Sequence, residues 1–104
     1  LMTDTNILDT LQFDDNGFMV NWLEWNEDIA RAIAADEGIG LTERHWVVIK
    51  FARGVYAEKN DGPTLRQITS QTDVSTKEMY QLFPNGPAKK AAMIAGLPKP
   101  TGCI

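Results

Sequence analysis

The segment from Thr42 to Tyr56 restricts the possible folds of this chain more than any other. It is predicted to form a helix with apolar side chains over more than half of its circumference: Trp46, Val47, Val48, Ile49, Phe51, Ala52, Val55 and Tyr56. A helix that is apolar on so many sides has to be buried among other elements. The turn sequence Asn-Asp-Gly-Pro at 60–63 ends it. We therefore expect this helix to be the central and most buried one, although Gly54 in its interior costs about 1 kcal/mol of helix stability.

Cap and breaker residues predict four further helices around the central one, at 26–38, 64–71, 75–83 and 87–96. Asn26 is a good N-cap for the first of them. The next two begin with the spacing of a capping box: Thr64 with Gln67, and Ser75 with Glu78. The last has proline at its first position and Gly96 as its C-terminal cap.

An N-terminal β-hairpin is predicted before these helices, because alternating apolar residues flank the turn signal Asp-Asn-Gly at 15–17. These residues are Leu11 and Phe13 before the turn, and Phe18, Val20 and Trp22 after it. The predicted fold class is mainly α: a small orthogonal helical domain of about five helices with an N-terminal β-hairpin and a mobile C-terminal arm. A length of 104 residues suits one core. We expect a single domain at 1–104, in which 97–104 form the flexible arm.

The predicted arm carries the only cysteine of the sequence, Cys103, at the position before its last residue, Ile104. Two prolines bracketed by Gly96 and Gly102 prevent a helix here and favour an extended, semi-rigid segment. At about 3.1 Å per residue, the chain from Gly96 to Cys103 reaches about 20 Å. A free cysteine is more often a small buried apolar residue. Its place after Pro-Thr-Gly, with no regular element to carry it inward, instead predicts an accessible thiol that can enter a pocket of another protein.

The sequence lacks the residues that several classes of function require. One cysteine and one histidine, His45, are too few soft ligands for a zinc site, so no metal is expected. The sequence has no glycine-rich phosphate loop and no hydrolase motif, so no cofactor is expected. The longest apolar run is 91–97, far short of the roughly 20 residues that cross a bilayer. Because the first residues also lack the pattern of a secretory signal, we expect a cytoplasmic protein without membrane contact.

The two halves of the chain differ in charge. Residues 1–52 carry a net charge of −7 and residues 53–104 carry +3, within a total of −4. From Pro84 onward the charged side chains are three cations: Lys89, Lys90 and Lys99. This small positive region is a candidate surface for an anionic partner, and it is also what ordinary solvated lysines would produce. Lysines close to Cys103 would raise its thiolate fraction, whereas the carboxylate of Ile104 would lower it.

Three stretches of the sequence carry a resemblance to a known family: 41–46 (LTERHW), 80–89 (YQLFPNGPAK) and 94–104 (IAGLPKPTGCI). With these motifs the chain resembles the DsrC/TusE family of small sulfur-trafficking proteins, over nearly its whole length from the hairpin onward. The resemblance implies a small, mostly helical domain with an N-terminal hairpin and a mobile C-terminal arm.

The same resemblance implies a sulfur carrier rather than a stand-alone enzyme. Cys103 would accept sulfane sulfur as a persulfide and pass it to the next protein. The donor would be a hexameric sulfur-transfer complex, and the acceptor an ATP-dependent tRNA thiouridylase that makes 2-thiouridine. For binding, the resemblance implies docking charges at Lys89 and Lys90, with Lys99 beside them, and a cradle for the retracted arm at Arg66 and His45. For Arg66 and His45 the alternatives are a solvated arginine and a partly buried, hydrogen-bonded helix histidine.

A second role within the family stays open. Its two-cysteine members serve dissimilatory sulfite reductase and carry another cysteine eleven residues before the penultimate one, where this chain has Ala92. Without a second thiol, an intramolecular disulfide or trisulfide cannot form, so the resemblance is closer to the single-cysteine TusE type. If Ala92 replaces a native cysteine, this objection disappears. A regulatory relative that docks without carrying sulfur is also possible.

DNA binding is a third candidate, because residues 65–80 have the spacing of a helix-turn-helix in which Ser75 opens the recognition helix. That helix offers only Lys77 as a cation, next to Glu78. Affinity for duplex DNA depends on several phosphate contacts by Lys and Arg. The charge balance therefore argues against direct DNA binding.

Overall fold

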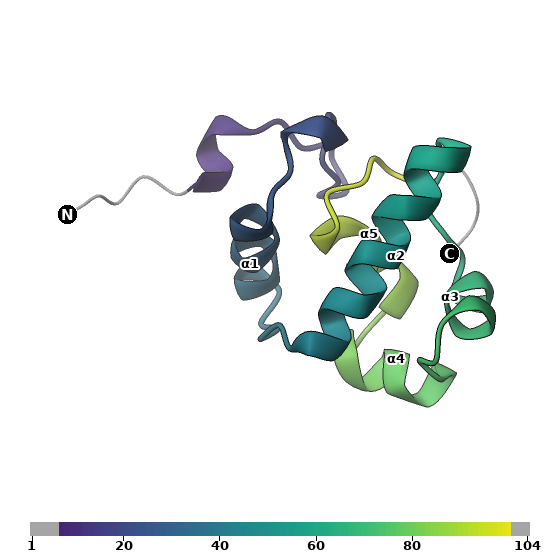
Figure 1. The fold of residues 1–104 in the computed structure, drawn as a ribbon. Helices are drawn as coiled ribbons and strands as arrows, with labels where there is room; N and C mark the ends of the chain where they lie inside the picture. Colours follow the sequence, from purple (N-terminus) through teal and green to yellow (C-terminus); the bar gives the residue numbers. More distant parts are fainter. Residues whose placement is uncertain (1–6, 101–104) are drawn as a thin grey trace.

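The computed structural model describes residues 7–100 of the chain, which form five α-helices and two short 3-10 helices (Figure 1). The α-helices are α1 (Glu27–Asp36), α2 (Glu43–Lys59), α3 (Leu65–Gln71), α4 (Thr76–Leu82) and α5 (Pro87–Ile94), and the 3-10 helices are η1 (Ile7–Thr10) and η2 (Trp22–Glu24). The mainly helical fold with five helices is thereby confirmed. None of the helices within 7–100 has the length and apolar character needed to span a bilayer.

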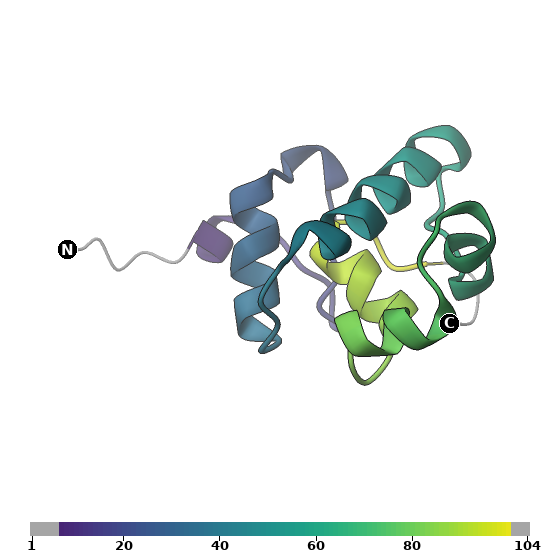
Figure 2. The same cartoon turned by 60° about the horizontal axis from the view of Figure 1, so that its bottom comes forward.

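Helix α2 lies between α1 and α3 in both views of the molecule (Figures 1 and 2). It contributes His45, Val48, Ile49 and Ala52 to the interior, while Val47 stays 40% exposed. The sequence predicted α2 as the most buried helix, but in the structure that helix is α5. Its buried residues are Pro87, Ala88, Ala91, Ala92, Met93 and Ile94. Small side chains allow α5 to approach α1, α2 and α4 closely, so that it is covered by all three.

The predicted helix starts are largely confirmed. The side chain of Asn26 accepts a hydrogen bond from the backbone N–H of Ile29 at 2.9 Å. Thr64 and Gln67 form a complete capping box with both reciprocal bonds. At α4 only half of the predicted box forms: Ser75 Oγ accepts from the N–H of Glu78, but the Glu78 carboxylate turns to an arginine instead of back to the cap.

The predicted N-terminal hairpin is reduced to a tight turn with a single antiparallel bridge, between Phe13 and Met19. Asp14 explains the difference, because its carboxylate accepts hydrogen bonds from the N–H groups of Asn16 and Phe18 and so organises the turn by itself. After the bridge, Asn21 caps η2 by accepting from the N–H of Leu23. The chain therefore enters a 3-10 helix where the second strand was expected.

Candidate functional site

Cys103, the predicted sulfur-carrying residue, lies outside the residues that the structure describes. The structure does describe the start of the predicted arm, 97–100. Leu97 is fully buried within the hydrophobic core, and its Cδ1 lies 3.2 Å from where a Cβ on Gly62 would stand. Lys99, two residues later, is exposed. The chain is thus held by the core up to Leu97, next to the loop between α2 and α3.

The end of α5 has the hydrogen bonds of a Schellman motif. Gly96 N–H donates to the carbonyl of Met93, and Leu97 N–H donates to the carbonyl of Ala92, both at 3.1 Å. Gly96 adopts φ +72°, a left-handed conformation that favours glycine. The predicted C-terminal cap is confirmed, and it turns the chain sharply before the arm begins.

Two side chains from elsewhere in the fold bind the last carbonyls of α5. Trp25 Nε1–H donates to the carbonyl of Ile94 at 2.9 Å, and Arg53 Nη1–H donates to the carbonyl of Ala95 at 2.9 Å. Partial burial lowers the pKa of the Arg53 guanidinium from its ordinary value, but an arginine remains charged. A cation is well placed here because the C-terminal end of a helix carries partial negative charge.

Two of the predicted binding residues meet at one groove. Its volume is about 530 Å³, and it is lined by Thr64, Leu65, Arg66, Tyr80, Gly86, Pro87, Ala88 and Lys89. Arg66 comes from α3 and Lys89 from α5, and both side chains are exposed. Tyr80 of α4 is 55% exposed. The groove therefore combines an apolar lining with two cations, which suits a partner segment that is apolar and carries negative charge.

The other predicted binding residues lie apart from this groove. Lys90 forms an ion pair with Glu37 at the end of α1, and both side chains are partly buried. The charge of Lys90 is thus paired within the fold, whereas its neighbour Lys89 forms no ion pair among residues 7–100. His45 is only 5% exposed and sits at the start of α2.

Both ring nitrogens of His45 form hydrogen bonds within the protein. Its Nδ1 accepts the backbone N–H of Thr42 at 3.0 Å, and its Nε2 lies 2.8 Å from the carbonyl oxygen of Leu82. Because a carbonyl oxygen only accepts, Nε2 carries the proton. The ring also packs edge-on against Phe83. This is the arrangement of a hydrogen-bonded core histidine, and it ties α2 to the end of α4.

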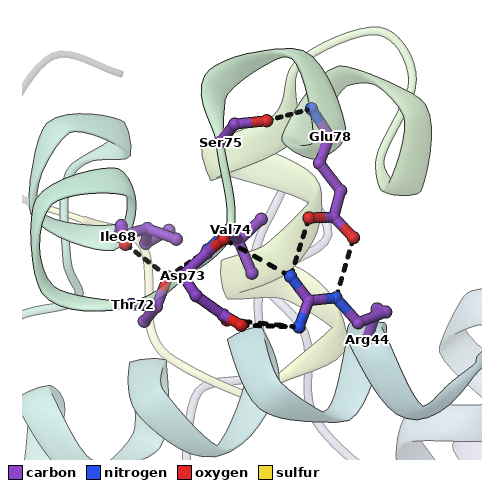
Figure 3. Close-up of polar contacts among 7 residues, drawn as sticks. All are labelled: Arg44, Ile68, Thr72, Asp73, Val74, Ser75 and Glu78. Atoms are coloured by element: carbon purple, nitrogen blue, oxygen red, sulfur yellow. Dashed lines mark hydrogen bonds and ion pairs between the residues drawn. The ribbon is translucent and has the colours of Figure 1, made fainter.

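An arginine of α2 ties down the turn between α3 and α4 (Figure 3). Arg44 makes a double hydrogen bond to the Glu78 carboxylate, with both N–O distances at 2.8 Å, and a further ion pair with Asp73. This guanidinium holds the pKa of the Glu78 carboxyl below its ordinary value through those hydrogen bonds. The segment with helix-turn-helix spacing thus carries one acidic group at its turn, Asp73, and one in the first turn of α4, Glu78, which is unfavourable beside DNA phosphates.

The ion pair predicts a pH dependence of stability that Glu78→Gln should remove. Because the pKa of Glu78 is lowered by folding, the carboxylate stabilises the native state above its ordinary pKa of about 4.5, and this contribution disappears as the pH falls through the lowered value. Urea unfolding from pH 7 to pH 3 should show wild type more stable than the variant at pH 7, with the gap closing in acid. The control is Glu58→Gln, because Glu58 forms no ion pair among residues 7–100. A gap that is constant with pH would contradict the prediction.

Reasoning from the sequence missed Trp25 and Arg53 as residues near the arm. A possible signal was Arg53 itself, a cation inside the helix predicted to be most apolar. Within 7–100, no three His, Cys, Asp or Glu side chains come together in a way that could hold a metal ion. In the part of the chain that is described, the site therefore consists of the arm's start, the side chains of Trp25 and Arg53 that bind the carbonyls before it, and the groove that holds Arg66 and Lys89.

Comparison with known families and sequences gives consistent matches over most of the chain. A family model described as "DsrC like protein" matches residues 7–104. A protein named sulfurtransferase TusE from Yersinia pseudotuberculosis is 42% identical over 105 aligned residues, which cover 94% of each chain. The protein of the same name from Pectobacterium atrosepticum is 40% identical, covering 91% of this chain and 94% of the relative.

Solved structures with the same fold include two DsrC proteins. The oxidised gamma-subunit of the dissimilatory sulfite reductase (DsrC) from Archaeoglobus fulgidus matches with a TM-score of 0.82 and 40% identity, covering 90% of this chain and 92% of that one. The solution structure of DsrC from Allochromatium vinosum matches with a TM-score of 0.76 and 37% identity, covering 90% of both chains.

Proposed function

Because this chain belongs to the DsrC-like protein family, we propose that it is a sulfur carrier that uses Cys103 to relay sulfane sulfur between proteins. The observation that carries the proposal is the family match over 7–104, which includes Cys103, together with relatives of about 40% identity that are named sulfurtransferases. By its similarity to the TusE proteins, the acceptor is a tRNA thiouridylase that makes 2-thiouridine, and the protein acts in the cytoplasm.

The chemistry is thiol exchange without net oxidation or reduction. The Cys103 thiolate attacks the outer sulfur of a persulfide on the donor protein, so that a new S–S bond forms to Cys103. The old S–S bond breaks, its electron pair stays on the donor's cysteine sulfur, and that cysteine leaves as a thiolate. The persulfide on Cys103 then gives its outer sulfur to a cysteine of the acceptor by the same exchange. One cysteine on the carrier is sufficient for both steps.

The proposed docking surface is the groove that holds Arg66 and Lys89. Both cations are exposed there beside apolar side chains, and neither forms an ion pair within 7–100. Lys99 adds an exposed cation on the described part of the arm. Lys90 contributes less, because Glu37 already neutralises it. The proposed donor and acceptor therefore present acidic groups to this surface.

Reversing one groove charge tests this surface. Lys89→Glu should raise the donor concentration for half-maximal sulfur transfer about fivefold at low salt, because rim charges act mainly on the rate of encounter. The difference should shrink in about 0.5 M NaCl through screening. Lys50→Glu is the matched control, since Lys50 is an exposed lysine lining a different, shallow pocket on α2. An equal effect of Lys50→Glu would assign the effect to net charge instead of the groove.

A role as partner of dissimilatory sulfite reductase is the second candidate, supported by the likeness to the two DsrC structures. In the family pattern this role uses a second cysteine at position 92. Here Ala92 is 3% exposed in α5, and its carbonyl accepts the Leu97 N–H. A native cysteine codon at position 92 would favour this role, and an alanine codon favours the single-cysteine carrier.

The direct test of the carrier is intact-mass analysis of the protein after incubation with a cysteine desulfurase, cysteine and any relay proteins that it requires. The expected product has gained one sulfur atom, and a reductant removes it. If no persulfide appears with competent donors, the carrier function is wrong.

A further inference from the structure

We propose that Arg53 is a positioning residue for sulfur transfer, and that together with Trp25 and Gly96 it sets the direction in which the arm leaves the domain. These three residues are called the arm anchor below. The inference rests on the proposed function, because it assigns a purpose to the contacts at the base of the segment that carries Cys103.

The guanidinium of Arg53 is held in one orientation by four contacts. Its central carbon lies 4.1 Å from the ring centroid of Trp25 and 4.9 Å from that of Trp22. In the guanidinium plane, one nitrogen donates to the carbonyl of Ala95 at 2.9 Å and another to the carbonyl of Trp22 at 3.1 Å. A planar group that stacks on rings and donates along its edge has little freedom left. Arg53 therefore holds the carbonyl oxygen of Ala95 at a fixed place.

Holding that oxygen fixes the direction of the chain. The carbonyl of Ala95 belongs to the planar peptide unit that ends at Gly96, so its position sets the orientation of that unit. Gly96 has φ +72° and lies directly against the Trp25 ring, where a Cβ would come within 2.6 Å of Trp25 Cγ. The Trp25 ring also binds the preceding carbonyl, that of Ile94. Leu97 then enters the core, so the arm starts from one point in one direction.

Within the arm anchor, Arg53 can be changed without removing the main supports of the fold. The hydrophobic core consists of buried apolar side chains to which Arg53 does not belong, and the N-terminal caps of α1 and α3 lie elsewhere. Arg31 provides a matched comparison, because its guanidinium also packs over a tryptophan, at 5.2 Å from the ring of Trp46. Arg31 belongs to α1, where it pairs with Glu27 and Asp28, and within residues 7–100 it forms no hydrogen bond or ion pair with the start of the arm. Removing the Arg31 guanidinium therefore disturbs one cation–π contact and removing that of Arg53 disturbs two, but only Arg53 also binds a carbonyl at the base of the arm.

The test compares Arg53→Met with Arg31→Met in the full chain, using a cysteine desulfurase with cysteine and its relay proteins as the sulfur source. Methionine keeps the apolar stem and removes the charge and the donors. We expect Arg53→Met to lower the sulfur-transfer rate at saturating donor about tenfold, because small misplacements of a reacting group are costly. The donor concentration for half-maximal rate, and the rate at which iodoacetamide alkylates Cys103, should stay within about twofold of wild type. Arg31→Met should leave all three unchanged, and Arg53→Lys should recover part of the rate.

Each outcome decides the proposal. A folded Arg53→Met protein that transfers sulfur at the wild-type rate overturns the proposal. It is also overturned if Arg31→Met lowers the transfer rate as much as Arg53→Met does, or if Arg53→Met slows the alkylation of Cys103 as much as it slows sulfur transfer. If Arg53→Met does not fold, Trp25→Phe replaces it, since phenylalanine keeps a ring near Gly96 while it removes the Nε1–H donor together with part of the indole ring. A wild-type rate in folded Trp25→Phe then counts against the proposal. If the wild-type protein gains no sulfur, the proposed carrier function itself is wrong.

Discussion

Cys103→Ser is expected to abolish sulfur loading of the protein. The sequence contains one cysteine, so the variant has no thiolate to attack the donor persulfide. Serine has no sulfur with which to form a persulfide, so no slower route leads to the loaded product. We expect the mass of the variant to stay unchanged after incubation with donors that load the wild type fully. Circular dichroism should show the same thermal unfolding for both proteins, which separates chemistry from folding.

A relocated thiol provides the control for this variant. Ser70→Cys with Cys103→Ser keeps one thiol per chain, at an exposed position of α3 where the exchange of oxygen for sulfur is almost isosteric. This protein should react with iodoacetamide but load sulfur at least about a hundredfold more slowly than wild type, because its thiol lacks the placement that raises the effective concentration. Loading at the wild-type rate would contradict the role of the arm, and loading of Cys103→Ser itself would contradict the role of Cys103.

Gly96→Ala is expected to cause the largest loss of stability of the single substitutions considered. An alanine methyl would lie 2.6 Å from Trp25 Cγ and 2.8 Å from Trp25 Cβ, and those atoms belong to the rigid part of the side chain. The left-handed φ of +72° costs about 1–2 kcal/mol for a residue with a Cβ. Overpacking adds about 1–3 kcal/mol. The total loss of about 2–5 kcal/mol is a large share of the 5–15 kcal/mol typical of a domain.

The same substitution at Gly54 provides the matched control. Gly54 lies in the interior of α2, and a Cβ built there meets no atom within 4 Å. Gly54→Ala should therefore raise the free energy of unfolding by about 0.5–1 kcal/mol through helix propensity. Urea unfolding followed by tryptophan fluorescence measures both variants. Equal and small effects at the two positions would show that the contact between Gly96 and Trp25 relaxes easily.

Local signals in the sequence predicted the helices well. Asn26, Thr64 and Gly86-Pro87 act on residues three or four positions away, so their effect is readable from the sequence. The hairpin prediction failed for a local reason as well, because Asp14 completes the turn with its own side chain and leaves one bridge where strands were expected. The half-formed capping box at Ser75 failed for a tertiary reason, since Arg44, 34 residues away, attracts Glu78 more strongly.

The sequence predicted only those residues of the candidate site that lie in or near the family motifs. The family motif pointed to Cys103 and to Arg66 with Lys89, and the structure brings the latter two to one groove. The contacts at the base of the arm join residues far apart in sequence: 42 positions separate Arg53 from Ala95, and 69 separate Trp25 from Ile94. Such pairs follow from the packing of whole helices, which spacing in one sequence does not reveal. The ion pair between Lys90 and Glu37 could not be predicted for the same reason.

The burial of Leu97 turns the proposed arm into a tether of limited length. Since the core holds the chain up to this residue, six residue steps remain to Cys103, or about 20 Å when extended. A donor and an acceptor must each bring their reactive cysteine inside this small sphere. Two proteins that both cover the base of the tether exclude each other, so loading and unloading would alternate. Steady-state kinetics of the complete relay should then show the parallel reciprocal plots of a ping-pong mechanism.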